Sequence, residues 1–271
     1  MIRKKKGLAL IAAIMLIVFV TIAVLGISTF ITQWFSQLNA DQISAKCLYL
    51  AQAGIHDALY DVRNIYISTP NTYGYYSTGL VTVDSGETYR RGGTAADFLM
   101  VDTSEVSQSG TDLSGLYIQK ATNSASPVVS IDRMVVTWSK SGQSRNLRSI
   151  RIAGSNRWTG NLSSPADANL PTNYTLTGTS IIPIDRLRFN ASMNGLNSMS
   201  IQFVMTDGSS KTVTVYPASN SCQFTINSTG KVAGSSIYRT IKATYDLMPL
   251  TFNTTSRIVD IDEINTEITS P

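Results

Sequence analysis

The stretch Leu8–Thr32, with the sequence LALIAAIMLIVFVTIAVLGISTFIT, contains no charged residue, and the next charge along the chain is Asp41. As a helix this stretch would be about 38 Å long, whereas the hydrocarbon core of a bilayer is about 30 Å thick. The apolar core of a cleavable secretory signal is shorter, about 7–15 residues. The stretch therefore predicts a transmembrane helix over residues 8–32, because a helix satisfies its backbone polar groups internally.

The charges around this segment predict its orientation. Four cations, Arg3, Lys4, Lys5 and Lys6, precede it, and such a cluster favours a cytoplasmic N-terminus. We therefore expect a single-pass protein of the inner, cytoplasmic membrane with its C-terminal domain outside. Without these four cations the chain has 18 basic and 18 acidic residues. A neutral remainder makes the membrane, and not nucleic acid, the expected partner.

The helix is predicted to continue beyond the membrane. Residues 33–65 contain no proline, and apolar residues recur there at spacings of three and four, which is typical of an amphipathic helix. We expect one helix from about Leu8 to about Ile65, amphipathic over residues 33–66, with its apolar stripe packed on the rest of the chain. The stripe consists of Leu48, Ala51, Ile55, Ala58, Leu59 and Val62.

The remainder divides into two parts by composition. Residues 67–127 are rich in Ser, Gly and Tyr, and we expect a partly structured connection in which the islands Phe98–Val101 and Leu116–Ile118 form edge strands. Residues 128–271 alternate apolar and polar side chains, with turn residues between the runs, which predicts a β-rich domain. The fold class is therefore α+β, with the long helix packed on a mostly antiparallel β-sheet or β-sandwich.

Several strands of this domain can be placed from the alternation. The strongest signal is a hairpin in which Asp207-Gly208-Ser209 turns the chain between Met199–Phe203 and Val213–Val215. A second turn is expected at Ser228-Thr229-Gly230. The other expected strands are Val128–Trp138, Leu147–Ala153, Cys222–Ile226 and Thr240–Tyr245.

The two cysteines leave two readings open. Outside the cytoplasm a disulfide between Cys47 and Cys222 is permitted and would join the helix to the domain. Two cysteines so far apart in sequence can equally be buried free thiols. With His56 as the one histidine, they cannot supply a tetrahedral metal site.

We expect no cofactor and no enzymatic activity. Asp260, Asp262, Glu263 and Glu267 form an acidic cluster that could hold calcium, but its spacing matches no EF-hand loop. A strand with a solvated acidic face explains the same residues. The sequence contains no phosphate-binding loop, zinc-protease helix motif or nucleophile elbow.

Two motifs resemble the N-terminal segment of type IV prepilins, over roughly residues 3–62. The basic leader ends in Lys6-Gly7 directly before the apolar helix, and Cys47-Leu48-Tyr49-Leu50-Ala51-Gln52-Ala53-Gly54-Ile55 resembles the block that follows the span in PilX-like minor pilins. The resemblance implies that a prepilin peptidase cuts after Gly7 and makes Leu8 the new N-terminus. It also implies that other pilin or pseudopilin subunits surround the helix in a filament core, through Leu10, Ile11, Ala12, Ile14, Ile17, Phe19 and Val24.

One position departs from the family pattern. Major pilins have a glutamate at the fifth mature position, where it neutralises the amino terminus of a neighbouring subunit, whereas this chain has Ala12. An ammonium group buried without a partner is costly, so a subunit without the acid suits a filament tip better than the shaft.

The sequence thus favours a non-enzymatic minor pilin or pseudopilin, at or near the tip of a cell-surface or periplasmic filament. The alternative is a signal-anchored envelope protein whose β domain binds a surface ligand such as a polysaccharide. The two hypotheses differ on whether the bond between Gly7 and Leu8 is cut.

Overall fold

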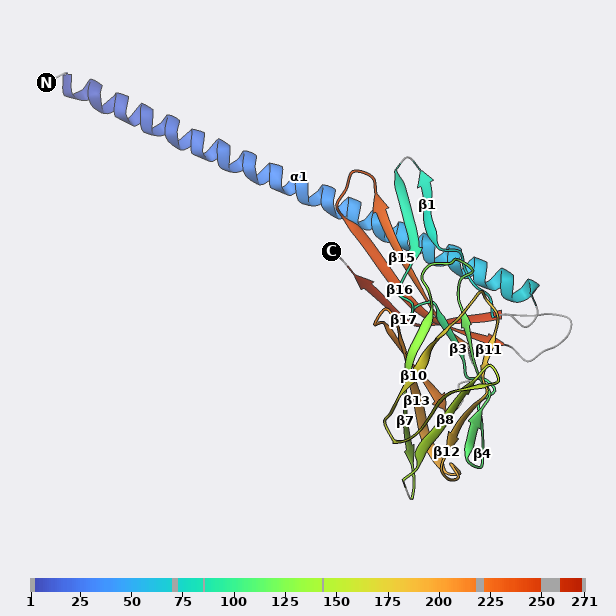
Figure 1. The fold of residues 1–271 in the computed structure, drawn as a ribbon. Helices are drawn as coiled ribbons and strands as arrows, with labels where there is room; N and C mark the ends of the chain where they lie inside the picture. Colours follow the sequence, from blue (N-terminus) through green and yellow to red (C-terminus); the bar gives the residue numbers. More distant parts are fainter. Residues whose placement is uncertain are drawn as a thin grey trace. The chain divides into compact units, whose positions relative to one another are not determined.

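The computed structural model describes residues 3–69, 73–84, 86–142, 144–217, 222–249 and 259–269. Within these ranges the chain forms one helix, α1 (Arg3–Ser68), and 17 strands, and every strand pair is antiparallel (Figure 1). This confirms the α+β class, with one long apolar N-terminal helix and a mostly antiparallel β domain. The chain divides into two compact units, Met1–Lys46 and Cys47–Pro271.

Helix α1 is longer at both ends than the sequence predicts, and it is long and apolar enough to span a bilayer. Three threonines inside the apolar segment make local hydrogen bonds. The hydroxyls of Thr21, Thr29 and Thr32 donate to the carbonyl oxygens four residues earlier, at 2.7–2.8 Å. These three threonines therefore need no polar partner outside the helix.

An eight-stranded sheet is organised around β15. Along one edge β15 pairs with β16 over residues 222–231, and β17 extends the sheet beyond β16. The other edge is shared, because β2 pairs with residues 227–232 of β15 and β3 pairs with residues 222–223. β1 flanks β2, and β6 and β11 continue from β3. The bounds are β1 Gly79–Asp84, β2 Glu87–Gly92, β3 Leu99–Asp102, β6 Leu116–Lys120, β11 Ile182–Ile184, β15 Cys222–Val232, β16 Tyr238–Pro249 and β17 Val259–Thr269.

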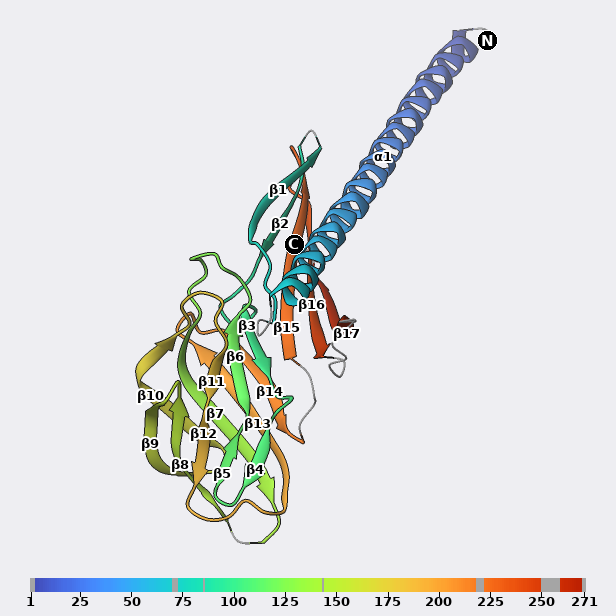
Figure 2. The same cartoon turned by 90° about the vertical axis from the view of Figure 1, so that its right-hand side faces the viewer.

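Two further sheets form a sandwich. One has the order β10-β7-β13-β14 and the other β4-β5-β12-β8-β9 (Figures 1 and 2). Trp138 of β7 meets Phe189 of β12 edge to face between them, with ring centroids 5.1 Å apart. The bounds are β4 Ser107–Ser109, β5 Asp112–Ser114, β7 Ser130–Lys140, β8 Asn146–Ile152, β9 Ser155–Ser163, β10 Ala166–Thr175, β12 Arg186–Phe189, β13 Leu196–Met205 and β14 Ser210–Tyr216.

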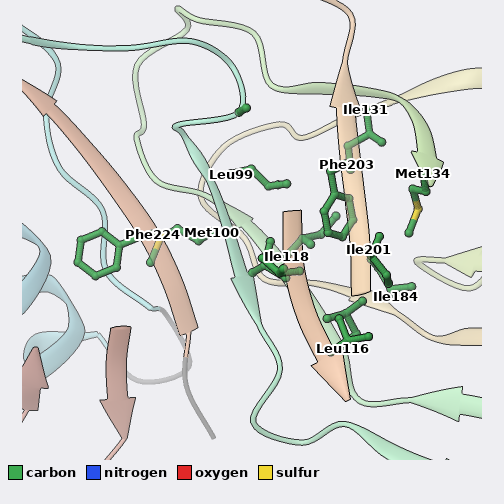
Figure 3. Packing of buried hydrophobic residues seen from close by; sticks show 14 of the residues in the cluster. Leu99, Met100, Leu116, Ile118, Ile131, Met134, Ile184, Ile201, Phe203 and Phe224 are labelled. Atoms are coloured by element: carbon green, nitrogen blue, oxygen red, sulfur yellow. The ribbon is translucent and has the colours of Figure 1, made fainter. Parts of the chain in front are cut away.

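One continuous apolar core joins these sheets. Figure 3 shows Leu116 and Ile118 of β6 beside Ile201 and Phe203 of β13, so the β3–β6–β11 part of the large sheet packs into the sandwich. Each of these four side chains is almost completely buried. The burial of such a core supplies the main favourable free energy of folding for the β domain.

The structure differs from the sequence prediction between residues 67 and 127. This segment contributes six strands, β1–β6, so it is part of the β domain and not a connection. β3 and β6 are interior strands and not edge strands, because each has a partner on both sides. Their partners β11 and β15 follow much later in the chain, and such pairing leaves no mark on the local sequence pattern.

The predicted hairpin is confirmed, whereas the second predicted turn is wrong. β13 and β14 pair with Ile201 opposite Val213, and the chain turns at residues 206–209. The segment Ser228–Gly230 is not a turn, because β15 continues to Val232. Its polar residues are held extended by β2 on one side and β16 on the other.

Helix α1 lies against β15 at two glycines, Gly54 of the helix and Gly230 of the strand. A Cβ added to Gly230 would overlap the carbonyl oxygen of Cys47 and lie 2.6 Å from the amide nitrogen of Ala51. A Cβ added to Gly54 of the helix would overlap the Ser228 hydroxyl and lie 2.8 Å from the Tyr89 ring. At Gly230 the strand therefore contacts the helix backbone directly, and at Gly54 the helix backbone contacts the side chains of Ser228 and Tyr89.

This contact predicts a selective effect of alanine. Gly230→Ala places a methyl group against helix backbone, which cannot rotate away, and should lower the free energy of unfolding by about 1–3 kcal/mol. Gly92→Ala in the neighbouring strand β2 is the control, because a Cβ there has no atom within 4 Å. Denaturant unfolding of the full chain in detergent, followed by tryptophan fluorescence, measures both. Equal stability of the two variants would contradict the close contact.

Candidate functional site

The first candidate site is the apolar half of α1. Each large apolar side chain from Ile11 to Phe35 is exposed, from 45% for Ile31 to 71% for Phe19. A helix that is apolar around its whole circumference requires an apolar environment, either lipid or other helices. Of the predicted membrane or filament contacts, Ile11, Ala12, Ile14, Ile17, Phe19 and Val24 lie on this exposed surface. The backbone of Gly7, Leu8 and Leu10 is helical, and their side chains lie outside the described part.

The second candidate site is the face of α1 within the globular unit. Ala51, Ile55 and Val62 are buried, and Leu48 and Leu59 are partly buried against the core. Sequence reasoning missed Leu50 and Gly54, which are also buried. The missing side chain of Gly54 is what admits Ser228. A glycine that falls on the apolar stripe of a helix was the available signal for this approach.

Beside this face, a buried arginine connects the helix to β2. Nη1 of Arg91 lies 3.1 Å from Oδ2 of Asp57 and 3.1 Å from Oδ2 of Asp61, one helical turn further on. The Arg91 side chain is 8% exposed, whereas the two carboxylates are 39% and 31% exposed. The hydroxyl of Tyr89 donates to Asp57 at 2.7 Å. Two residues of β2 thus fix two acids of the helix.

Tyrosines near this contact remain neutral donors. Burial, aided by the hydrogen bond to Asp57, raises the pKa of Tyr89 to about 12. Burial also raises the pKa of Tyr76, whose hydroxyl donates to the Thr225 carbonyl oxygen at 3.1 Å. Both phenols hold β15 and the helix in place as uncharged groups.

Of the two readings for the cysteines, the structure has free thiols and not the disulfide. Both are buried, and Cys47 Sγ donates to the Ile237 carbonyl oxygen at 3.4 Å. Cys47 lies beside Gly230, whereas Cys222 begins the same strand eight residues earlier. Eight extended residues span about 26 Å, far beyond the roughly 7 Å between Cα atoms that a disulfide tolerates.

A partly buried lysine lies where three strands meet. Nζ of Lys211 in β14 donates to the carbonyl oxygens of Leu99 in β3, at 2.7 Å, and Gln223 in β15, at 3.4 Å. Burial lowers its pKa to about 8. This lysine connects the sandwich to the large sheet through backbone oxygens.

The remaining candidates carry no site in the described residues. His56 is exposed on α1. The side chains of the calcium candidates Asp260, Asp262 and Glu263 lie outside the described part. Among the described residues, no group of three or more His, Cys, Asp or Glu side chains is placed to hold a metal ion.

Comparisons with protein-family models, with curated proteins and with solved structures find no match for this chain.

The contribution of the Arg91 ion pairs to stability can be measured by comparison with an exposed ion pair. Arg91→Met leaves two acids beside a buried apolar side chain and should lower the free energy of unfolding by about 1–3 kcal/mol, since both acids retain some water. The control is Arg133→Met. Nη1 of Arg133 lies 2.7 Å from Oδ2 of Asp167, so the two form an ion pair, but their side chains are 43% and 51% exposed. That change should cost less than about 1 kcal/mol. An equal loss in the two variants, in the same unfolding assay, would argue against a structural role for Arg91.

The lowered pKa of Lys211 should make the free energy of unfolding depend on pH. Its pKa is about 8 in the folded chain and 10.5 ordinarily, so between these values the unfolded chain binds more protons. The stability contribution of Lys211 should therefore rise from pH 8 to pH 9.5, before the tyrosines titrate. Unfolding at several pH values compares the wild type with Lys211→Met, in which this rise should be absent. Identical pH slopes would show that the buried ammonium is not penalised.

Proposed function

We propose that the chain is a non-enzymatic minor pilin or pseudopilin subunit, processed after Gly7 and assembled through α1. The observation that carries the proposal is the helix segment that begins directly after a basic leader and a glycine and exposes apolar side chains on all sides. This is the surface that a subunit needs if it moves from lipid into a bundle of similar helices.

In this proposal the leader cations hold the N-terminus in the cytoplasm, and the β domain lies outside. Before assembly Leu8–Thr32 spans the inner membrane as a single pass. During assembly the helix exchanges lipid for equally apolar neighbours, so its extraction requires little free energy from the hydrophobic effect. The hydroxyls of Thr21, Thr29 and Thr32 remain bonded within the helix throughout.

Ala12 supports a position at or near the filament tip. Cleavage after Gly7 creates an ammonium group at Leu8, and residue 12 is one helical turn further on. An alanine there offers no carboxylate to a neighbouring ammonium group. A subunit that need not neutralise another amino terminus belongs at the end of a filament.

Leader processing is the decisive test. The chain is produced in cells with a prepilin peptidase, and its N-terminus is determined by intact mass. We expect a protein that begins at Leu8, and we expect Gly7→Val to retain the leader because the side chain blocks the extended substrate backbone. Gly26→Val is the matched control, since Gly26 lies within the same apolar helix with no atom within 4 Å of an added Cβ.

A wild-type chain that retains Arg3–Lys6 would contradict the proposal. It would favour the permanently anchored envelope protein, whose function would then depend on the surface of its β domain.

A further inference from the structure

The five-stranded sheet collects arginines that are scattered in the sequence. Its strands carry five arginines, no lysine and one acid, Asp112, although the chain without its leader is neutral. Arg148 and Arg151 lie in β8, Arg157 in β9, and Arg186 and Arg188 in β12. The sequence contains no basic run at these positions, so the concentration of charge arises only from strand pairing.

Three of these arginines share the outer face of the sandwich. Arg186 pairs with Arg151 directly across the strands, and Arg188 lies two residues further along β12. Leu187 and Ile150 between them are 0% exposed in the core, so the arginines point the other way. The three side chains start within about 8 Å of one another.

The charges on this face are not balanced. Oδ2 of Asp112 lies 3.7 Å from Nη1 of Arg186, and Oδ1 of Asp112 lies 3.8 Å from Nε of Arg188. Both distances are longer than a hydrogen bond. Arg151 has no ion pair within the described part of the chain, and Nε of both Arg151 and Arg186 is buried there without a hydrogen-bond partner. Like charges directly opposite each other on a sheet destabilise it. The fold therefore maintains an unfavourable cluster that a bound anion would stabilise.

Neutral polar side chains extend the same face. Arg151 pairs with the exposed Asn156 of β9, and the buried Ser149, opposite Arg188, pairs with the exposed Thr159 of β9. Two rows thus run across β12, β8 and β9 over about 10 Å, one Arg186–Arg151–Asn156 and the other Arg188–Ser149–Thr159. Guanidinium groups bind carboxylates bidentately, and amides and hydroxyls suit sugar hydroxyls.

We propose that this face, defined as Arg151, Arg186, Arg188, Asn156 and Thr159, binds a carboxylate-bearing polysaccharide. Nucleic acid fits less well, because stacking on bases needs exposed aromatic rings. Trp158 of β9 lies opposite Ile150 and therefore on the inner side of the sheet. A face about 10 Å wide also matches one or two saccharide units better than a long row of phosphates.

The test measures binding of the full chain, in detergent, to polyuronate oligosaccharides by titration at low and high salt. We expect binding that weakens with salt and that falls at least about tenfold in the double variant Arg151→Gln and Arg186→Gln, since two charge-assisted contacts are lost. Arg188→Gln should also weaken binding, because the side chain of Arg188 is 52% exposed and so within reach of a ligand. Arg133→Gln on the opposite sheet is the matched control and should bind as the wild type does.

Two further readouts separate this proposal from a structural role and from general charge attraction. The melting temperature of the double variant should stay the same or rise, because a like-charge pair is removed. Neutral dextran should not bind, and single-stranded DNA of equal charge should bind more weakly. Absent polyuronate binding, an equal loss in Arg133→Gln, a lower melting temperature of the double variant, or tighter binding of DNA would each overturn the proposal. None of these outcomes depends on whether the leader is cleaved.

Discussion

The direct contact between α1 and β15 is the constraint on which the globular unit depends. Gly54 and Gly230 let the two backbones approach, and a side chain at either position would separate them. Ala51, Ile55, Ala58 and Val62 are buried along this face, and the buried Arg91 fixes the helix from the neighbouring strand. The contact combines small residues, apolar burial and a partly desolvated ion pair, each of which requires the others to be in place.

β15 also explains how one chain joins a helix-bearing sheet to a sandwich. Its second half pairs with β2, beside the helix, and its first residues pair with β3, which leads into the sandwich core. Lys211 reinforces this branch point, because its ammonium group bonds to backbone oxygens of both β3 and β15.

The sequence predicted those features that repeat within a few residues. The long helix, its apolar stripe and the hairpin around Gly208 follow from periods of 3.6 and 2. It did not predict that β3 and β6 are interior, that Ser228–Gly230 is extended, or that Arg151 meets Arg186. Each of these depends on a partner from a distant part of the chain. Gly54 lay within reach of prediction, because a glycine on an apolar stripe indicates close packing as well as a weak helix.

The functional proposals rest on two surfaces that the fold leaves unsatisfied: the apolar surface of α1 and the arginine face of the sandwich. The central claim is that the apolar helix exchanges lipid for protein neighbours. Its most direct test is a photo-crosslinking amino acid at Phe19, the most exposed of the large apolar side chains from Ile11 to Phe35, in cells that assemble the filament. The account predicts adducts with the N-terminal helices of other pilin subunits, whereas adducts with lipid alone would show that the helix is a permanent anchor.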